Sequence, residues 1–260
     1  MEIIPAVIPQ SKKDLLDHIE KVHRIVPIMQ IDVCDGRFVS SVSWPYVSVA
    51  GKGAGAASGA KALAHARSVE TVDAELASFN EDGLPYWEDL DYEIDMMVDD
   101  PVHEIERWIA VGAKRLVLHV KSLEKDGTSL SDGLDIFFST LEKEHGYVDA
   151  AHFDFFELGA ALSIDTPIEA IAPYIDRFHF IQLMGIDTIG LQGQAFDEKV
   201  LDRVREAKRL FPNVPVSVDG GVSLDTAPDL IDAGADRLVV GSAIFKNLNI
   251  ADAVNAFKML

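Results

Sequence analysis

Short runs of β-favouring residues alternate along this chain with longer stretches whose apolar residues recur at helical spacing. The stretch 196–211 shows the helical pattern clearly, with Val200, Val204 and Ala207 on one face. The expected strands are 2–9, 27–33, 92–98, 115–120, 153–162, 178–185, 214–219 and 237–240. The expected helices are 11–24, 101–111, 129–145, a short one after Pro167, 196–211, 224–233 and 250–260.

The repeat of strand-then-helix units, about eight in all, predicts the fold class. The strands are nearly continuous apolar runs, which is typical of a parallel sheet covered by helices. Eight such units close into a (β/α)8 TIM barrel, and we expect one barrel domain over residues 1–260. Active residues of such barrels lie at the C-terminal ends of strands. Asp32, Asp95, Asp219 and the pair Gly241-Ser242 all fall at such ends.

The segment 47–91, after the second expected strand, is longer than one helix and two loops require. Residues 51–61 read Gly-Lys-Gly-Ala-Gly-Ala-Ala-Ser-Gly-Ala-Lys, a composition that favours an extended surface loop. The Gly-Lys-Ser/Thr ending of a phosphate-binding P-loop is missing, so nucleotide binding is not predicted here. Two interpretations stay open, a lid or crossover loop over the barrel mouth and a solvated insertion.

Charge narrows the classes of partner. The chain has 23 Lys and Arg against 43 Asp and Glu, a formal net charge of −20, which disfavours nucleic acids and anionic membranes. A phosphate would be repelled at long range and would need local backbone N–H groups. The single cysteine, Cys34, rules out an internal disulfide framework. With neither a signal-peptide pattern nor an apolar run of about 18 residues, we expect a cytoplasmic protein.

The stretch 214–221, Val-Pro-Val-Ser-Val-Asp-Gly-Gly, carries the first chemical signal. A carboxylate at the end of a buried strand has to be paired, coordinated or used, because burying it alone is expensive. Gly220 and Gly221 leave backbone N–H groups open to a ligand. An acid beside an anion-ready turn suggests chemistry on a phosphorylated small molecule, although Asp-Gly is also an ordinary turn pair.

Four segments together resemble the ribulose-phosphate 3-epimerase family. They are Gln-Ile-Asp-Val-Cys-Asp-Gly-Arg-Phe-Val at 30–39, Glu-Ile-Asp-Met-Met-Val at 93–98, Val-Asp-Gly-Gly at 218–221 and Val-Gly-Ser-Ala-Ile-Phe at 240–245. The resemblance covers nearly the whole chain apart from 47–91. It implies a barrel that inverts the carbon next to the ketone of a pentulose 5-phosphate.

The resemblance also implies the site. Asp32 and Asp219 match the two aspartates that remove and return the proton, while a divalent metal stabilises the enediolate. Two carboxylates at one centre should differ in protonation, as an acid and a base must. The family's phosphate contacts carry over to backbone groups and one hydroxyl, at Gly220, Gly221, Gly241, Ser242, Gly190 and Gly193.

The chain departs from the family at its metal ligands. Two family histidines are replaced by Gln30 and Asp95, which leaves Gln30, Asp32, Asp95 and Asp219 as the implied metal set. Oxygen donors favour Mg²⁺ or Mn²⁺ over Zn²⁺, and a site without metal stays an alternative. Three converging carboxylates would repel one another, so we expect a cation, a shared proton or a basic partner. Ala6 stands where the family has Ser.

Two other functions stay open. A related phosphate-barrel lyase or aldolase, such as a hexulose-phosphate synthase, would carry Lys in an Asp-x-Lys-x-x-Asp pattern, which 32–35 lacks. A catalytically inactive barrel could bind a sugar phosphate or a protein partner. Asp95 is read equally as a ligand or a structural acceptor, and His119 as a substrate-facing or a barrel-lining residue. A phosphorylated sugar is the expected partner, with homo-oligomers as a further expectation.

Overall fold

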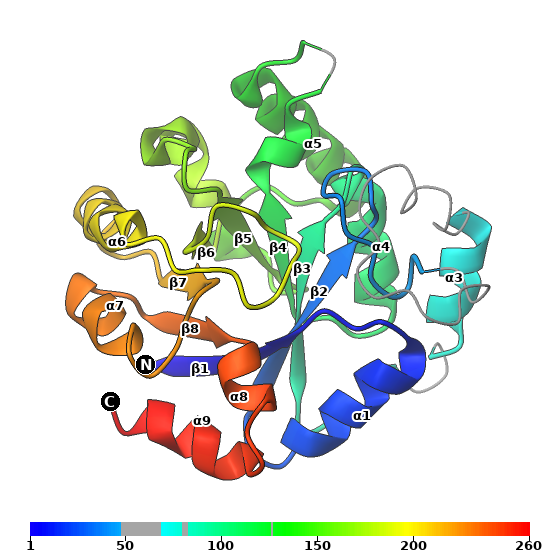
Figure 1. The fold of residues 1–260 in the computed structure, drawn as a ribbon. Helices are drawn as coiled ribbons and strands as arrows, with labels where there is room; N and C mark the ends of the chain where they lie inside the picture. The colour runs from blue at the N-terminus through cyan, green and yellow to red at the C-terminus, as the bar shows by residue number, and fades with distance from the viewer. Residues whose placement is uncertain (48–68, 80–82, 126) are drawn as a thin grey trace.

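Eight parallel strands close into a barrel with helices on its outside, which confirms the predicted (β/α)8 class (Figure 1). The computed structural model describes residues 1–47, 69–79, 83–125 and 127–260. Each strand pairs with its neighbours in sequence, and β1 pairs with β8 to close the sheet. The strands are β1 (Glu2–Val7), β2 (Ile28–Cys34), β3 (Asp91–Met97), β4 (Arg115–His119), β5 (Glu157–Leu162), β6 (Phe180–Met184), β7 (Val216–Asp219) and β8 (Arg237–Val240).

The helices follow their strands in the expected order, with boundaries that differ by a few residues. They are α1 (Lys12–Val22), α3 (Val69–Ala77), α4 (Pro101–Ala110), η1 (Val120–Leu123), α5 (Leu130–His145), η2 (Ala150–His152), η3 (Ile168–Arg177), α6 (Lys199–Leu210), α7 (Ala227–Ala233), α8 (Ser242–Phe245) and α9 (Ile250–Lys258). None of the helices in the described part of the chain is both long and apolar enough to cross a bilayer.

Three expected boundaries were wrong by three residues or more. β5 begins at Glu157 rather than at 153, because Phe153 and Phe156 are buried against the ring of Tyr147 instead of extending the strand. α6 begins at Lys199 rather than at 196, and α7 begins at Ala227 rather than at 224. An apolar run of this kind packs equally well from a loop, so its periodicity alone does not fix where the strand or helix starts.

The segment 47–91 includes part of the regular outer layer of the barrel. Its described part contains α3, whose residues Val72 and Leu76 are buried in the core. Leu84 and Leu90 are also buried and lead the chain into β3. The Gly- and Ala-rich stretch 51–61 lies outside the described residues, so both interpretations of this segment, a lid and a solvated insertion, stay predictions.

An ion-pair network closes the N-terminal end of the barrel, and it joins the charged first residues of β1, β4, β5 and β8. Arg115 at the start of β4 contacts Glu2 of β1 and Glu157 of β5, each at 2.8 Å. Arg237, at the start of β8, lies 3.3 Å from Glu2. Glu93, inside this end, is fully buried, and its nearest cation in the network is Arg115 at 3.8 Å. The opposite, C-terminal end is therefore left for the site.

Candidate active site

Three aspartates from three strands meet at the C-terminal end of the barrel. Asp32 on β2 is in register with Asp95 on the neighbouring β3, and Asp219 ends β7. One carboxylate oxygen of each lies within 4.8 Å of the others. The three acids that the sequence analysis selected therefore lie together, as expected for residues near the C-terminal ends of parallel barrel strands.

Gln30 connects two of these acids. Its amide nitrogen Nε2 donates to Oδ1 of Asp32 at 2.7 Å and to Oδ2 of Asp219 at 2.9 Å. Its carbonyl oxygen Oε1 is buried and has no hydrogen-bond partner within the described structure. Gln182 on β6 adds a longer contact of 3.4 Å to Asp219. One neutral amide thus holds the two carboxyl groups of the expected acid–base pair.

Burial and mutual repulsion shift these carboxyl groups toward their protonated forms. The pKa of Asp32 is raised well above its ordinary value, first by burial and then by the charges of Asp219 and Asp95. Burial, with the charge of Asp95, raises the pKa of Asp219 to about 7, against the hydrogen bond from Gln30. Around neutral pH the pair therefore holds protons that ordinary aspartates would have lost, as proton transfer between carbon and carboxylate requires.

The donor set fits a hard divalent cation. Three carboxylates within reach of one point offer oxygen ligands, which suit Mg²⁺ and Mn²⁺ better than Zn²⁺. Oδ2 of Asp95 and Oε1 of Gln30 are buried polar atoms without hydrogen-bond partners in the described chain. A cation among the three carboxylates would pair with Oδ2 of Asp95 and relieve the repulsion among the acids.

His119, the last residue of β4, contacts the carboxyl group of Asp95. Its Nε2 lies 2.8 Å from Oδ1 of Asp95, and both side chains are 1% exposed. From the sequence, His119 could face the substrate or line the barrel. In the structure it contacts Asp95, one of the predicted metal ligands. The available signal was its position at a strand end next to β3, since neighbouring parallel strands bring their ends together.

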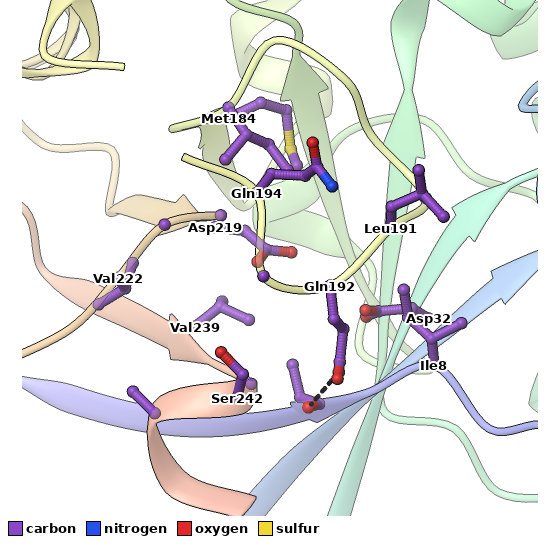
Figure 2. Close-up of a pocket in the computed structure, with 18 of the residues that line it drawn as sticks. Ile8, Asp32, Met184, Leu191, Gln192, Gln194, Asp219, Val222, Val239 and Ser242 are labelled. Carbon is purple, nitrogen blue, oxygen red and sulfur yellow. Dashed lines mark hydrogen bonds between the residues drawn. The ribbon is translucent and has the colours of Figure 1, made fainter. Parts of the chain in front are cut away.

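A pocket of about 300 Å³ opens beside the three acids (Figure 2). Asp32, Asp95 and Asp219 line it together with all six residues expected to bind phosphate, namely Gly190, Gly193, Gly220, Gly221, Gly241 and Ser242. Gln30 lies beneath the acids and is not among its lining residues. The structure thus brings the expected acids and the expected phosphate contacts to one pocket.

Glycine is required in the turn after β7. Gly220 and Gly221 have φ of 98° and 70°, in the left-handed region that favours glycine. A Cβ on Gly221 would lie 2.7 Å from Cα of Phe196, and one on Gly220 would lie 2.7 Å from the side chain of Ile186. Only glycine therefore fits at these two positions, and both residues line the pocket. Turns of this kind can bind anions through successive backbone N–H groups.

Lys246 is a further site residue that the sequence analysis did not identify. Of the residues that line the pocket, it is the one with a cationic side chain. Its Nζ is 4.0 Å from where a Cβ on Gly193 would stand, so it reaches the phosphate-binding side. The sequence feature that could have indicated this role is its position four residues after Ser242, a predicted phosphate contact, at the end of α8. It supplies a local positive charge that a chain of net charge −20 otherwise lacks at this pocket.

A family model and several curated proteins are similar to this chain in sequence. The model described as "Ribulose-phosphate 3 epimerase family" matches residues 82–245, a range that contains Asp95 and Asp219 and begins after Asp32. The ribulose-phosphate 3-epimerase of Aquifex aeolicus is 24% identical over 239 residues, 90% of this chain and 84% of the relative. That of Schizosaccharomyces pombe is 28% identical over 154 residues, so the match spans 59% of each chain.

Solved structures share the barrel. KGPDC from Streptococcus mutans, in complex with D-R5P, has a TM-score of 0.60 at 16% identity, over 99% of this chain and 95% of its own. The 3-hexulose-6-phosphate synthase from Salmonella typhimurium has a TM-score of 0.57 at 14% identity, over 100% and 97%. At such identities the likeness shows the fold alone.

Proposed function

The chain belongs to the ribulose-phosphate 3-epimerase family, and from this premise we propose that it is an epimerase acting on a phosphorylated ketose. The observation that carries the proposal is the pair of carboxyl groups, Asp32 and Asp219, held by the one amide of Gln30 beside a glycine-lined pocket. An acid and a base at one carbon are what inversion next to a ketone needs.

In this mechanism one aspartate is ionised and the other protonated when the ketose binds. The ionised carboxylate removes the proton from the carbon next to the ketone, and the electron pair moves into the enediolate. The protonated aspartate then returns a proton to the opposite face, and the carbonyl reforms. The raised pKa of both Asp32 and Asp219 makes each able to hold that proton near neutral pH. After one turnover the two residues have exchanged protonation states.

Asp32, Asp95 and Asp219 would hold a divalent cation, which would supply positive charge against the negative charge that develops on the substrate oxygens. His119 fixes the orientation of Asp95 through the 2.8 Å contact. Gln30 keeps Asp32 and Asp219 at a fixed spacing and donates to whichever carboxylate is ionised. We assign Mg²⁺ or Mn²⁺ to the site because its donors are oxygens.

The phosphate of the ketose would lie against Gly220, Gly221, Gly241 and Ser242, with Gly190 and Gly193 closing over it. The positive φ of the glycines in both turns and the cation of Lys246 support an anion at this end of the pocket. The fold neighbour from Streptococcus mutans contains D-R5P, which supports a pentose phosphate as the ligand class. Cys34 is buried and free, in keeping with the expected cytoplasmic location; assembly into homo-oligomers stays a prediction.

The test is conversion of D-ribulose 5-phosphate, followed by NMR of the product with Mg²⁺, Mn²⁺ or Zn²⁺ added to metal-stripped protein. The expected product is the C3 epimer, D-xylulose 5-phosphate. Release of a smaller carbon fragment would support the lyase alternative instead. Binding without conversion of any sugar phosphate would contradict the proposal and favour an inactive barrel.

A further inference from the structure

Gln192, in the loop between β6 and α6, reaches across the pocket to the opposite wall. Its Nε2 donates to the backbone carbonyl of Ala6 on β1 at 3.3 Å. The same nitrogen lies 3.1 Å from where a Cβ on Gly241 would stand. In Figure 2 the side chain extends into the pocket between the labelled Ser242 and Asp32. Gln192 therefore stands between the phosphate-binding end and the acid end.

The wall that Gln192 reaches offers few other polar side chains. Ala6 and Ile8, from the β1 side, and Val239, from β8, line the pocket there with apolar groups. A hydroxyl facing this wall would lose its water without gaining a side-chain partner, which is costly for binding. The amide of Gln192 and the carbonyl of Ala6 are the polar groups that meet at this wall in the described structure.

The amide of Gln192 can serve such a hydroxyl without moving far. Its bond to Ala6 uses one N–H, so a second N–H and the carbonyl oxygen stay available for a ligand. The same bond ties the tip of the side chain to β1, so part of the ordering cost is met before a ligand arrives. A neutral amide also avoids adding charge beside Asp32 and the phosphate.

We infer that Gln192 is a specificity-determining residue that hydrogen-bonds a hydroxyl on the carbon chain between the phosphate and the reacting carbon. This inference rests on the proposed function, because it takes the phosphate to lie at Gly241 and the reacting carbon at Asp32 and Asp219. The ligand class it selects is a polyhydroxylated alkyl phosphate over a plain alkyl phosphate of the same length. A site built to bond a hydroxyl rejects the analogue that lacks it.

The test uses two unreactive ligands of equal length, D-arabinitol 5-phosphate and n-pentyl phosphate, with inorganic phosphate as the reference. Their dissociation constants are measured by calorimetry for the full-length protein with Mn²⁺. The wild type is expected to prefer the pentitol phosphate. Gln192→Met keeps the length of the side chain and removes its hydrogen bonds, so this preference should fall by about tenfold. Binding of inorganic phosphate should change by less than about twofold, since Gln192 is not assigned to it.

Gln194→Met is the matched control, because it makes the same change in the same loop, and Figure 2 draws Gln194 on the Met184 side of the pocket. It should keep the preference for the pentitol phosphate. An unchanged preference in Gln192→Met, or an equal loss in both variants, would overturn the inference and leave the proposed function standing. If Gln192→Met loses the preference as expected but the wild type does not epimerise D-ribulose 5-phosphate, the hydroxyl contact is supported and the proposed function is overturned. Failure of both alkyl phosphates to bind would overturn both.

Discussion

Asp95 and His119 form a buried pair in which Nε2 of the histidine lies 2.8 Å from Oδ1 of the aspartate. His119 is the last residue of β4, and Asp95 lies two residues before the end of the neighbouring β3; each side chain is 1% exposed. Asp95 stands where the resemblance to the family implies a histidine, and an imidazole is present on the neighbouring strand β4. The pair leaves Oδ2 of Asp95 without a hydrogen-bond partner among the described residues, free to contact a cation.

We therefore expect His119→Gln to weaken Mn²⁺ binding by about 10- to 100-fold, as is typical when a residue that orients a metal ligand is changed. Mn²⁺ affinity is measured by calorimetry and by electron paramagnetic resonance on metal-stripped protein. His18→Gln, on the outer helix α1, is the control and should bind as the wild type does. Unchanged Mn²⁺ affinity in His119→Gln would show that Asp95 needs no support from β4.

Restoring both family histidines should change the choice of metal. The double variant Gln30→His, Asp95→His replaces an amide and a carboxylate with imidazoles, which favour Zn²⁺. We expect its affinity for Zn²⁺ relative to Mn²⁺ to exceed that of the wild type by at least about tenfold, measured by competition between the two ions. An unchanged ratio would mean that Gln30 and Asp95 do not contribute to the metal site.

The strand-end rule predicted that the three acids lie close together, because the position of residues near the C-terminal end of a parallel strand follows from the backbone alone. Asp32, Asp95 and Asp219 could be placed together in this way. The direction of the Gln30 amide could not, because it depends on which of its two polar atoms meets the carboxylates.

Residues that act through long side chains or through loops were harder to foresee. Lys246 and Gln192 reach the pocket from a helix end and a loop, and their reach depends on conformations that periodicity does not encode. The start of β5 was missed for a related reason, since Phe153 packs its ring inward without forming a strand. The hydrophobic pattern along the chain therefore predicts the barrel, whereas the residues that reach its pocket depend on side-chain packing and loop conformation.

Metal binding should strengthen as pH rises through about 7. Burial raises the pKa of Asp219 to about 7 and that of Asp32 well above its ordinary value, so protons occupy these groups at lower pH. A cation has to displace these protons, and fewer remain at higher pH. We expect Mn²⁺ to raise Tm more at pH 8 than at pH 6. An increase in Tm that is larger at pH 6 would contradict the assignment of these carboxylates as ligands.

Glu93 should make the stability of the wild type fall with rising pH. Burial raises its pKa to about 8, above the value near 4.5 expected when the chain is unfolded. The folded state therefore binds the proton more tightly, and its stabilising effect, complete below pH 4.5, is lost as pH rises through about 8.

Glu93→Gln removes this titration while keeping the shape of the side chain. The difference in the free energy of unfolding between Glu93→Gln and the wild type should shift in favour of the variant from pH 5 to pH 9, as measured by urea unfolding. Glu157→Gln, in the same ion-pair network but partly exposed, is the comparison and should show a smaller shift. A difference for Glu93→Gln that does not vary with pH would rule out a buried titrating group at this position.

Solvent deuterium exchange at C3 of the substrate, followed by NMR, tests the two-aspartate claim most directly. With Mn²⁺ bound, the wild type should exchange this proton in both D-ribulose 5-phosphate and D-xylulose 5-phosphate. Each of Asp32→Asn and Asp219→Asn should slow epimerisation by about 10²- to 10⁴-fold and retain exchange in one epimer only, a different one for each variant. Exchange of both epimers by either variant, or no exchange by the wild type with any metal, would contradict the account.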